Sequence, residues 1–427
     1  MRFSTLQAWL DWQESLNPRA IDLGLERVGR VWRRMGTELA ATRITVAGTN
    51  GKGSTIAFLE ALLEQSGRRT GSYTSPHLLR YNERIRIQGE PVDDATLMAA
   101  FDAIDRARGE IPLTYFEFGT LAAFWILARE RVEFALLEVG LGGRLDAVNL
   151  LDPQVAVITG IDLDHQQWLG TDREAIGREK AGILRPGRPA VYSGRRMPRS
   201  IGEIARRLGA PLYVNGDAYR VSLHPDGWSW HGPHRRLEGL PLPALEGEHQ
   251  LDNAAGALMA LDLLDIPLEK DLVTSGLKTV FITGRQQRRV IDGVTWWLDV
   301  AHNAQAARAL ARSLADSPVS GVTHGLLGVL ADKEADTLVE ALEGQIDHWH
   351  LATLDGPRGR SAQALARVVP GSCHSSVAEG VAALRKAVSP GDRVVVLGSF
   401  LTVGQALEAL TSSRGSPFQE DRALRGR

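Results

Sequence analysis

The chain has a single cysteine, Cys373, so no disulfide bond can form within it. This scarcity favours a reducing compartment, and we expect Cys373 to be a small core residue without a functional role. No apolar run approaches the roughly 20 residues that a membrane-spanning helix needs. The N-terminal stretch carries Asp11 and Glu14 where a signal peptide would need its apolar core. Together these absences predict a cytoplasmic protein.

The chain also lacks an excess of charge of either sign. Its formal net charge is −2, and no block of basic residues dominates. There is therefore no electrostatic reason to expect nucleic acid or an anionic membrane as a partner. The hydrophobic fraction of 44% and the charged fraction of 23% are typical of a globular, water-soluble protein. Because 427 residues exceed an ordinary single domain, we expect two domains.

What is present is an alternation of short, β-branched apolar runs with longer helical patterns. The runs RITVAG, FALLEVG and QVAVITG predict buried strands, whereas STIAFLEALLEQSG and DREAIGREKAGIL predict helices. Gly67 is expected to end the first helix, and Thr171 or Asp172 to cap the start of the second. Strands that are apolar throughout and separated by helices indicate a mostly parallel sheet.

Two later regions interrupt and then restart this pattern. Residues 214–243 are rich in His, Gly, Pro and Trp, and we expect a small antiparallel excursion or a long loop there. From Val290 on, a second set of strands is predicted by TWWLDVA, HGLLGVL, DHWHLAT and DRVVVLGSF, with helical patterns such as AQAARALARSLA and SVAEGVAALRKAV between them. The boundary is therefore expected near Ile282–Arg288. The polar end of the chain, SSRGSPFQEDRALRGR, is expected to fray.

The stretch VAGTNGKGST, residues 46–55, lies between a predicted strand and a predicted helix. Backbone N–H groups at a helix N-terminus are unpaired, and glycines let an anion approach them closely. Lys52 could then reach the outer phosphates of a nucleotide. The usual phosphate-loop pattern is not fully met, because Val46 stands at its first glycine and Gly53 separates Lys52 from Ser54. A plain strand–helix turn is the alternative, but the lysine favours a phosphate loop.

Polar residues at two other strand ends suggest a metal site beside this loop. Magnesium accompanies nucleotide phosphates and prefers hard oxygen ligands. Glu138 ends an otherwise apolar strand, where a carboxylate needs a cation or strong donors; a salt bridge with Arg144 is the alternative. Asp162, Asp164 and His165 follow another apolar run. Since ligands bind at the carboxyl ends of strands in open α/β sheets, these groups are expected to lie near the nucleotide.

A series of segments resembles, in order, the bifunctional dihydrofolate synthase/folylpolyglutamate synthases of the Mur ligase superfamily. They are AGTNGKGST, YTSPHLLRYNERIRIQG, LTYFEFGTLAA, LLEVGLGGRLDAVN, DLDHQQWLG, REKAGIL, LDVAHN and VLGSFLTV, with AIDLGLERV near the start. The likeness extends from about Ile21 to Val403. The loop alone would indicate only the superfamily, whereas TSPHL, FEFGT and EVGLGGRLDA are much more specific.

The resemblance implies a fold of the α/β class. A P-loop NTPase-like domain with a mostly parallel sheet would occupy residues 1–284. A smaller Rossmann-like domain, the glutamate ligase domain, would occupy residues 285–427, and the active site would lie in the cleft between the two. A monomer is expected.

The resemblance also implies an ATP-dependent ligase of folate synthesis. ATP would phosphorylate the carboxylate of dihydropteroate or of a folate, L-glutamate would attack the acyl phosphate, and ADP and phosphate would leave. A folylpolyglutamate synthase without dihydropteroate activity is the nearest alternative. A Mur-type cell-wall ligase should lack TSPHL and FEFGT and should carry an extra N-terminal domain, whereas only about forty residues precede the loop here. A nucleotide-binding module without ligase chemistry is the third.

Carried over by position, the resemblance assigns the nucleotide and metal ligands. The ATP ligands would be Thr49, Asn50, Gly51, Lys52, Gly53, Ser54, Asn253, Arg285 and Asp299, the last two from the second domain. Two Mg²⁺ ions are implied, with Ser75 and Glu138 holding the ion that bridges the nucleotide and Glu138 and His165 holding the second. Lys180 matches a lysine that is carbamylated in this superfamily, and a carbamate can ligate a metal where an ammonium cannot. The catalytic set would be Lys52, His165 and Lys180.

Some of these assignments have plainer alternatives. Lys180 could be a surface helix lysine, Asn253 could be a solvent-exposed helix residue, and His302 is as readily structural as functional. The pterin-binding residues implied by the resemblance are Ile21, Asp22, Leu23, Gly24, Thr114, Tyr115, Phe116, Glu117, Leu145, Asp146 and Ala147. Without the resemblance, these would be taken for core or cap residues. The segment SPHLLRYNERIRI is expected to form a mobile loop over the folate.

The sequence departs from the family pattern at three places. The hinge reads TGRQQ, without the usual proline before Gly-Arg. DHQQWLG replaces the commoner threonine and aspartate after the histidine, and AHNAQAA lacks a common proline. None of these changes removes a proposed phosphate or metal ligand, but the altered hinge affects the placement of Arg285.

Overall fold

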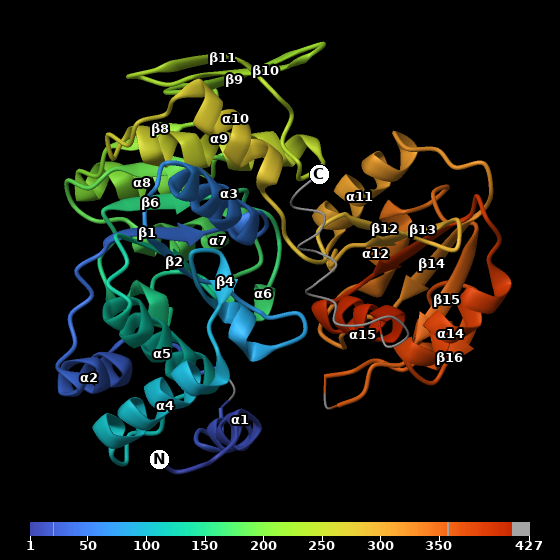
Figure 1. Cartoon of the computed structure of the whole chain (residues 1–427), viewed down its shortest axis with the longest axis horizontal. Coiled ribbons are helices and arrows are strands. Elements are labelled where there is room, and N and C mark those ends of the chain that lie inside the picture. The colour runs from blue at the N-terminus through green and yellow to red at the C-terminus, as the bar shows by residue number, and fades with distance from the viewer. Residues whose placement is uncertain (20, 357, 412–427) are drawn as a thin grey trace. The chain divides into compact units, whose positions relative to one another are not determined.

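The computed structural model describes residues 1–19, 21–356 and 358–411. The polar end that was expected to fray, residues 412–427, lies outside the described residues. Contacts divide the chain into two compact units (Figure 1). Unit 1 comprises Met1–His77, Tyr81–Ala244 and Glu248–Val280, and unit 2 comprises Leu78–Arg80, Leu245–Gly247 and the chain from Phe281 on.

Unit 1 is built on an eight-stranded sheet with the order β4-β3-β2-β5-β1-β6-β7-β8. Its strands are β1 (Thr42–Ala47), β2 (Thr70–Tyr73), β3 (Ile85–Ile87), β4 (Glu90–Pro91), β5 (Phe134–Glu138), β6 (Val155–Ile158), β7 (Ala190–Tyr192) and β8 (Leu212–Val214). The β2–β3 and β3–β4 pairs are antiparallel, and every other neighbouring pair is parallel. The central strands β5 and β6 are buried along their whole length, which explains their continuous apolar sequences. The prediction of a mostly parallel sheet is therefore confirmed.

Helices cover both faces of this sheet, as Figure 1 shows for α3, α9 and α10 on one face and α4 and α5 on the other. The helices of unit 1 are α1 (Leu6–Ser15), α2 (Glu26–Met35), α3 (Lys52–Gln65), α4 (Asp94–Arg108), α5 (Tyr115–Arg129), α6 (Gln166–Leu169), α7 (Arg173–Lys180), α8 (Arg199–Leu208), α9 (Glu248–Asp262) and α10 (Lys270–Thr279). Short 3₁₀ helices span Tyr81–Arg84, Ala147–Leu150 and Ala181–Ile183. Within the described ranges of the chain, no helix has the length and apolarity to cross a bilayer.

The local signals at helix ends are mostly as the sequence predicts. Asp172 caps α7, since its side chain accepts a hydrogen bond from the backbone N–H of Ala175 at 2.8 Å. Gly67, with φ of 70°, takes the left-handed position after α3. The start of α3 differs from the prediction: it begins at Lys52, two residues before the apolar pattern, because Gly51 turns the chain with φ of 91°.

The region that interrupts the alternating pattern forms a separate antiparallel sheet. Its strands are β9 (Arg220–His224), β10 (Gly227–His231) and β11 (Arg236–Leu240). Trp228 and Trp230 both lie in β10 and are fully buried. Their burial explains why a polar stretch contains two tryptophans. The antiparallel interpretation is confirmed, and the long-loop alternative is wrong.

Unit 2 contains a six-stranded sheet with the order β12-β13-β17-β14-β15-β16, parallel except for the β12–β13 pair. Its strands are β12 (Gln287–Ile291), β13 (Val294–Leu298), β14 (Thr323–Leu327), β15 (His348–Ala352), β16 (Ser372–His374) and β17 (Arg393–Leu397). Its helices are α11 (Ala304–Ala315), α12 (Ala335–Ala341), α13 (Ala362–Leu365), α14 (Val377–Ala387) and α15 (Phe400–Thr411). The four predicted strands are all present, and buried residues form one cluster on each face of the sheet.

The prediction that Cys373 is a core residue is wrong. This cysteine lies in β16, the edge strand of the unit 2 sheet, and is exposed rather than buried in the core. An edge strand has a neighbour on one side only, so its side chains are covered less than those of central strands.

Candidate active site

The loop of residues 48–51 connects the carboxyl end of β1 to α3, which begins at Lys52. The Lys52 ammonium donates to the carbonyl oxygens of Gly48 and Thr49, at 3.2 and 3.3 Å, and lies 4.0 Å from Glu138 Oε1. A side chain at Gly51 could not be accommodated, because a Cβ there would lie 2.4 Å from Asn253 Oδ1. The loop is thus packed tightly at Gly51, with its lysine directed at a carboxylate rather than at bulk solvent.

Neighbouring strand ends fix the backbone of this loop. Thr159, just after β6, donates to the carbonyl oxygen of Asn50 at 2.7 Å. Thr49 donates through its hydroxyl to the carbonyl of Asp162 at 3.0 Å and accepts the N–H of Asp162 at 3.1 Å. Ser54, in the first turn of α3, is 5% exposed. These hydrogen bonds join segments about a hundred residues apart. Together they fix the backbone conformation of the loop before α3.

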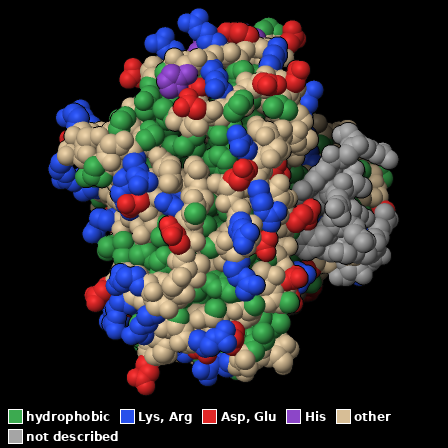
Figure 2. All heavy atoms as spheres, turned by 60° about the vertical axis from the view of Figure 1, so that its left-hand side comes forward, with side chains coloured by type: hydrophobic (Ala, Val, Ile, Leu, Met, Phe, Trp, Pro, Cys, Tyr) green, Lys and Arg blue, Asp and Glu red, His purple; other side chains and the backbone are tan. Residues whose placement is uncertain are grey.

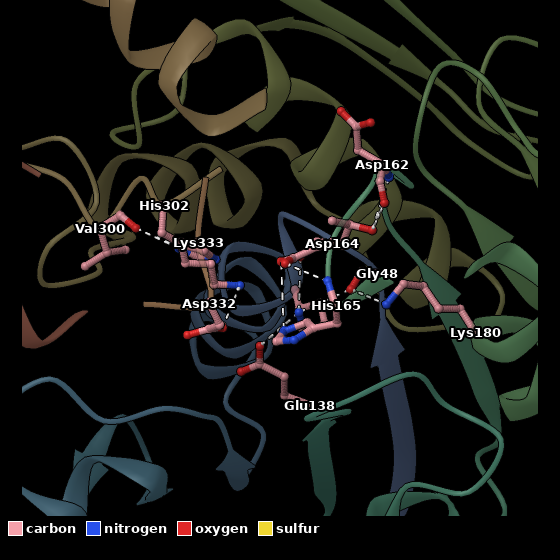
Figure 3. Close-up of polar contacts among 12 residues, drawn as sticks. Gly48, Glu138, Asp162, Asp164, His165, Lys180, Val300, His302, Asp332 and Lys333 are labelled. Carbon is pink, nitrogen blue, oxygen red and sulfur yellow. Dashed lines mark hydrogen bonds and ion pairs between the residues drawn. The ribbon is translucent and has the colours of Figure 1, made fainter. Parts of the chain in front are cut away.

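Lys180 lies at the end of α7 and is buried, with 5% of its surface exposed. Its Nζ donates to the carbonyl oxygen of Gly48 at 2.8 Å, so it points toward the glycine loop before α3 (Figure 3). Burial and, secondarily, the charge of Lys52 lower the pKa of Lys180 to about 7. The alternative of a surface lysine is wrong, and a neutral amine is accessible at this site near physiological pH.

Glu138 is a buried carboxylate at the carboxyl end of β5, 5% exposed. Its Oε2 accepts the backbone N–H of Ser75 at 3.0 Å, which brings Ser75 beside it. The alternative salt bridge is wrong, because Arg144 instead pairs with Glu179 at 3.0 Å. The carboxylate therefore faces Lys52 and Ser75.

These oxygen donors fit magnesium by their chemistry. Among the residues that the structure describes, no group of three His, Cys, Asp or Glu side chains forms a complete metal cage. Mg²⁺ does not need one, since it usually takes one or two carboxylates and fills its remaining positions with phosphate oxygens and water. Glu138, with the backbone of Ser75 beside it, supplies such a carboxylate.

His165 lies at the start of α6, on the segment that follows β6. It adopts a left-handed backbone with φ of 50°, and its Nε2 lies 3.9 Å from Asp164 Oδ2. Figure 3 shows Glu138, Asp164 and His165 grouped near Gly48. A positive φ in a non-glycine residue is uncommon and aims the imidazole toward this group rather than along a regular helix.

Asn253 lies in α9 and reaches the glycine loop before α3. It is 5% exposed, its Nδ2 donates to Gln250 Oε1 at 3.0 Å, and its Oδ1 lies close to Gly51. The alternative of a solvent-exposed helix residue is therefore wrong.

The pterin-binding segments predicted from the resemblance lie together in unit 1. The Gly24 N–H donates to the carbonyl of Leu145 at 3.2 Å. Arg27 joins two of the predicted carboxylates, with its NH1 2.6 Å from Asp22 Oδ2 and its Nε 2.8 Å from Glu117 Oε2. Arg27 was not predicted, and its role could not be read from the sequence because its partners lie five and ninety positions away.

Within this group, Asp146 and Phe116 flank the glycine segment after β5. Asp146 accepts the N–H groups of Leu141 and Val148, at 2.8 and 2.9 Å, and so caps the short helix at Ala147–Leu150. Burial raises the pKa of Asp146 to about 6 despite these bonds. The ring of Phe116 lies against Gly140, where a Cβ would come within 2.5 Å of it. Thr114 and Glu117 form a capping box that starts α5, with Tyr115 between them.

The segment SPHLLRYNERIRI is only partly a loop. Tyr81–Arg84 form a 3₁₀ helix, and Ile85–Ile87 form β3, paired with β2. The prediction of a mobile loop is wrong for this second half, because sheet pairing fixes it. Arg84 is 9% exposed, and its Nε donates to His77 Nδ1 at 2.8 Å. Neither its burial nor this hydrogen bond was predicted from the sequence.

In unit 2, Arg285 and Asp299 lie close to one another. Asp299 is buried and accepts the N–H groups of Gln286 and Ala301, at 2.9 and 2.8 Å. Burial raises its pKa, and the charge of Arg285 opposes that shift. The Arg285 guanidinium lies 5.4 Å from the centre of the Phe400 ring. His302 Nδ1 bonds the carbonyl of Val300 at 2.9 Å, a contact drawn in Figure 3.

Comparison with known protein families identifies both units. Residues 46–191 match the Mur ligase middle domain, and residues 284–400 match the Mur ligase glutamate ligase domain.

Individual relatives match nearly the whole chain. The dihydrofolate synthase/folylpolyglutamate synthase of Escherichia coli K12 is 41% identical over 413 residues, covering 96% of this chain and 97% of the relative. The solved structure of E. coli FolC in complex with DHPP and ADP superposes with a TM-score of 0.92 at 40% identity, covering 96% and 99% of the two chains. A bifunctional folylpolyglutamate synthase/dihydrofolate synthase with Mn, AMPPNP and L-glutamate bound gives a TM-score of 0.89 at 44% identity, covering 95% and 98%.

Proposed function

Because this chain belongs to the dihydrofolate synthase/folylpolyglutamate synthase family of Mur ligases, we propose that it joins L-glutamate to dihydropteroate and to reduced folates, using ATP. It is an ATP-dependent ligase by this membership. The observation that carries the proposal is the placement of Lys52, whose ammonium lies between the carbonyl oxygens of its own glycine loop and the carboxylate of Glu138.

The reaction needs an activated carboxylate. A free carboxylate is a poor acyl donor because its leaving group would be oxide. An oxygen of the substrate carboxylate attacks the γ-phosphorus of ATP, the bond to the β-phosphate oxygen breaks, and ADP leaves. The amine of L-glutamate then attacks the acyl carbon, the carbon–oxygen bond to phosphate breaks, and inorganic phosphate leaves while the amine loses a proton. The products are an amide, ADP and phosphate.

Phosphate transfer between two anions requires neutralisation of their charge and alignment of the reacting atoms. The unpaired N–H groups of Gly51, Lys52, Gly53 and Ser54 at the start of α3 cradle the ATP phosphates, together with Thr49 and Asn50. The Lys52 ammonium contacts the outer phosphates. Asn253, from α9, orients the nucleotide, and Arg285 and Asp299 supply further nucleotide contacts from unit 2.

Magnesium, when bound, supplies charge neutralisation between the phosphates and the attacking carboxylate. Ser75 and Glu138 would hold one ion, and Glu138 with His165 a second. The solved relatives with bound Mn and AMPPNP support a divalent metal beside the nucleotide.

Lys180 acts in this proposal as a carbamate. Its neutral amine attacks the carbon of CO₂, an N–C bond forms, and one proton is released to solvent. The lowered pKa of about 7 supports this step, because an ordinary lysine with a pKa near 10.4 is almost entirely protonated at neutral pH. The resulting carbamate would be a carboxylate-like anion near this loop, able to ligate a metal ion where the ammonium cannot.

The pterin end of the substrate binds where Ile21–Gly24, Thr114–Glu117 and Leu145–Ala147 lie together. Asp22 and Asp146 accept hydrogen bonds from the ring N–H and amino groups, and Phe116 supplies an apolar face. Each carboxylate oxygen of Asp146 can accept more than one hydrogen bond, so the bonds from Leu141 and Val148 leave acceptor capacity for the pterin.

The decisive test is an acceptor assay with ATP, Mg²⁺ and L-glutamate, run separately with dihydropteroate and with tetrahydrofolate. The proposal expects product, ADP and phosphate with both acceptors. Activity with tetrahydrofolate alone would reduce the function to folylpolyglutamate synthase. AMP as a product, or ATP hydrolysis independent of acceptor and glutamate, would contradict it.

A further inference from the structure

Histidine is concentrated in one part of unit 2. The face of the molecule in Figure 2 mixes Lys and Arg with Asp and Glu and shows few histidines. Four of the eleven histidines of the chain, by contrast, lie on the neighbouring strands β14, β15 and β16: His324, His348, His350 and His374. None of these four has a part in the proposed ligase reaction. Neutral imidazole is the commonest metal-binding side chain in proteins, so this histidine cluster is a candidate metal site.

The strand register places the four side chains on one face of the sheet. His324 pairs with His348 across β14 and β15, and His350 pairs with Ser372 across β15 and β16. Paired residues of neighbouring strands point the same way, and so do residues two apart on one strand. His348 therefore shares its face with His350, and His374, two residues after Ser372, shares it as well.

Helix α14 covers part of this face and leaves part of it open. A Cβ at Gly380 of α14 would lie 3.4 Å from His374 Cδ2, so the helix passes close to that imidazole. His374 is 8% exposed and His324 is 7% exposed, whereas His348 at the start of β15 is exposed. The histidine cluster thus combines two buried imidazoles with a side that water and ions can reach.

The two central imidazoles have the spacing of a metal-binding pair. Two imidazoles on one tetrahedral Zn²⁺ ion, with Zn–N distances of about 2.0–2.1 Å, place their nitrogens about 3.3 Å apart and their ring centres about 5 Å apart. His350 Nδ1 lies 3.1 Å from His374 Nε2, and the ring centres are 5.3 Å apart. Without an ion, one ring donates a hydrogen bond to the other. An ion would take the place of that proton, which moves to the second nitrogen of its own neutral ring.

His324 adds a nitrogen that lacks a partner. Within the part of the chain that the structure describes, its Nδ1 is buried and forms no hydrogen bond. A buried polar atom without a partner is unfavourable and calls for a ligand or an ordered water. The ring centre of His324 lies 5.6 Å from that of His350, close to the spacing of the pair. No three side chains of the described residues already form a complete cage, so the preformed part of the site is a pair.

We propose that His350 and His374 bind a divalent transition-metal ion such as Zn²⁺, with water and His324 available for its remaining positions. Imidazole nitrogens suit zinc, copper and nickel, whereas carboxylate, carbonyl and water oxygens suit magnesium. The site is therefore chemically distinct from the magnesium site proposed in unit 1, and it does not depend on the proposed function. An ion that binds only the folded state would join β15 to the edge strand β16 and stabilise unit 2.

The test measures Zn²⁺ binding to the full chain by competition with a chromophoric chelator, with Mg²⁺ in large excess. A His165→Ala background removes the histidine of the unit 1 metal site. About one Zn²⁺ per chain is expected, and His350→Asn and His374→Asn should each weaken binding at least about tenfold, since even outer-shell partners of metal ligands usually matter by that factor. Zn²⁺ should raise the melting temperature of the background protein and not of these variants.

Two controls are matched to the proposed ligands. His224→Asn removes an exposed histidine of β9, and Cys373→Ser removes the thiol next to His374 in sequence, which points to the opposite face of β16. Both should bind Zn²⁺ as the background protein does. Loss of binding in Cys373→Ser would overturn the assignment, because the thiol would then be the ligand.

A spectroscopic measurement does not depend on how well the variants fold. The zinc K-edge absorption spectrum of the His165→Ala protein should show scattering from about two imidazole rings. A spectrum without imidazole scattering, no Zn²⁺ retained against excess Mg²⁺, or equally tight binding by His350→Asn and His374→Asn would overturn the proposal. A negative acceptor assay would reject the proposed function and leave this site untouched.

Discussion

The two units build similar, mostly parallel sheets, but different kinds of ionisable side chain gather on them. In unit 1, Lys52, Lys180 and Glu138 lie near the carboxyl ends of β1 and β5. Both lysines donate to the carbonyl of Gly48, and Lys52 lies 4.0 Å from the Glu138 carboxylate. In unit 2, four histidines occupy neighbouring positions on β14, β15 and β16. Their ring centroids are 5.3 Å apart for His324–His348, 5.6 Å for His324–His350 and 5.3 Å for His350–His374.

This difference shows what each group of residues is suited to. The unit 1 groups can hold a highly charged ligand, because cation, carboxylate and unpaired N–H groups converge. The histidines face one another, and His350 Nδ1 lies 3.1 Å from His374 Nε2, so that one ring donates to the other. Protonating both of these nitrogens would remove the acceptor. The charges of Asp392 and Asp347 favour protonation of His324, and the charge of His374 lowers the pKa of Glu379. These three carboxylates are acidic neighbours of the cluster.

Removing the charge of Lys52 should have the largest effect. Lys52→Ala is expected to lower kcat at least about 100-fold, because a preorganised charge at the transferred phosphate is lost. The melting temperature should change little, since the hydrogen bonds of Lys52 go to loop carbonyls and its ion pair with Glu138 is long, at 4.0 Å. Lys278→Ala, which removes an exposed lysine of unit 1, is the control. Near-normal turnover in Lys52→Ala would move the phosphate site away from this loop.

A variant of Lys180 tests whether the neutral amine of this lysine reacts to form a carbamate. Lys180→Met should lower kcat about tenfold or more and abolish a ¹³C carbamate resonance that appears when wild type is equilibrated with ¹³CO₂. Because burial sets the pKa at about 7, the resonance should weaken as the pH falls below 7. A wild-type protein without this signal at pH 8, yet fully active, would refute the carbamate.

Mild acid should distinguish the two units. Burial and the neighbouring His374 lower the pKa of His350 to about 4, and burial also lowers the pKa of His324. An unfolded histidine takes up its proton near pH 6.5, so the unfolded state binds more protons between about pH 6.5 and 4, and unit 2 loses stability across that range. We expect a loss of about 1 to 2 kcal/mol after allowance for solvent screening.

Unit 1 should respond less, because two shifts oppose each other. His77, whose pKa is lowered to about 4, destabilises it in acid, whereas Asp146, whose pKa is raised to about 6, stabilises it as the pH falls. Hydrogen exchange at pH 7 and pH 5, corrected for intrinsic rates, should show β14–β16 opening first. His350→Asn should flatten this response, and equal protection of both units at pH 5 would count against it.

The smallest effect is expected at Cys373. Cys373→Ser should change the free energy of unfolding by less than about 0.5 kcal/mol, because the side chain is exposed on an edge strand. The native protein should also expose one thiol per chain to a thiol reagent. A thiol that reacts only after denaturation would show that unit 2 packs differently at β16.

Much of the fold was predictable because it depends on local patterns. Apolar strands such as FALLEVG, the cap at Asp172 and the glycine at position 67 carry their information within a few residues. The glycine-rich turn between β1 and α3 was predictable for the same reason, since its glycines lie within six residues of one another. The family assignment came from segments that occur in order along the chain.

What could not be predicted depends on long-range packing. The burial of Lys180 follows from its bond to Gly48, 132 positions away, and the role of Arg27 from its contact with Glu117, 90 positions away. The alternative pairing of Glu138 with Arg144 and the core placement of Cys373 were both wrong, because neither pairing nor exposure is encoded in neighbouring residues. The histidine cluster likewise exists only once β14, β15 and β16 pair in register.

The central claim is that the loop around Lys52 delivers the γ-phosphate of ATP to the substrate carboxylate. It is tested most directly by supplying dihydropteroate with ¹⁸O in its carboxylate and analysing the inorganic phosphate formed with ADP. The account predicts one ¹⁸O atom in each phosphate released, since the carbon–oxygen bond of the acyl phosphate breaks. Phosphate without ¹⁸O, formed alongside amide product, would contradict it.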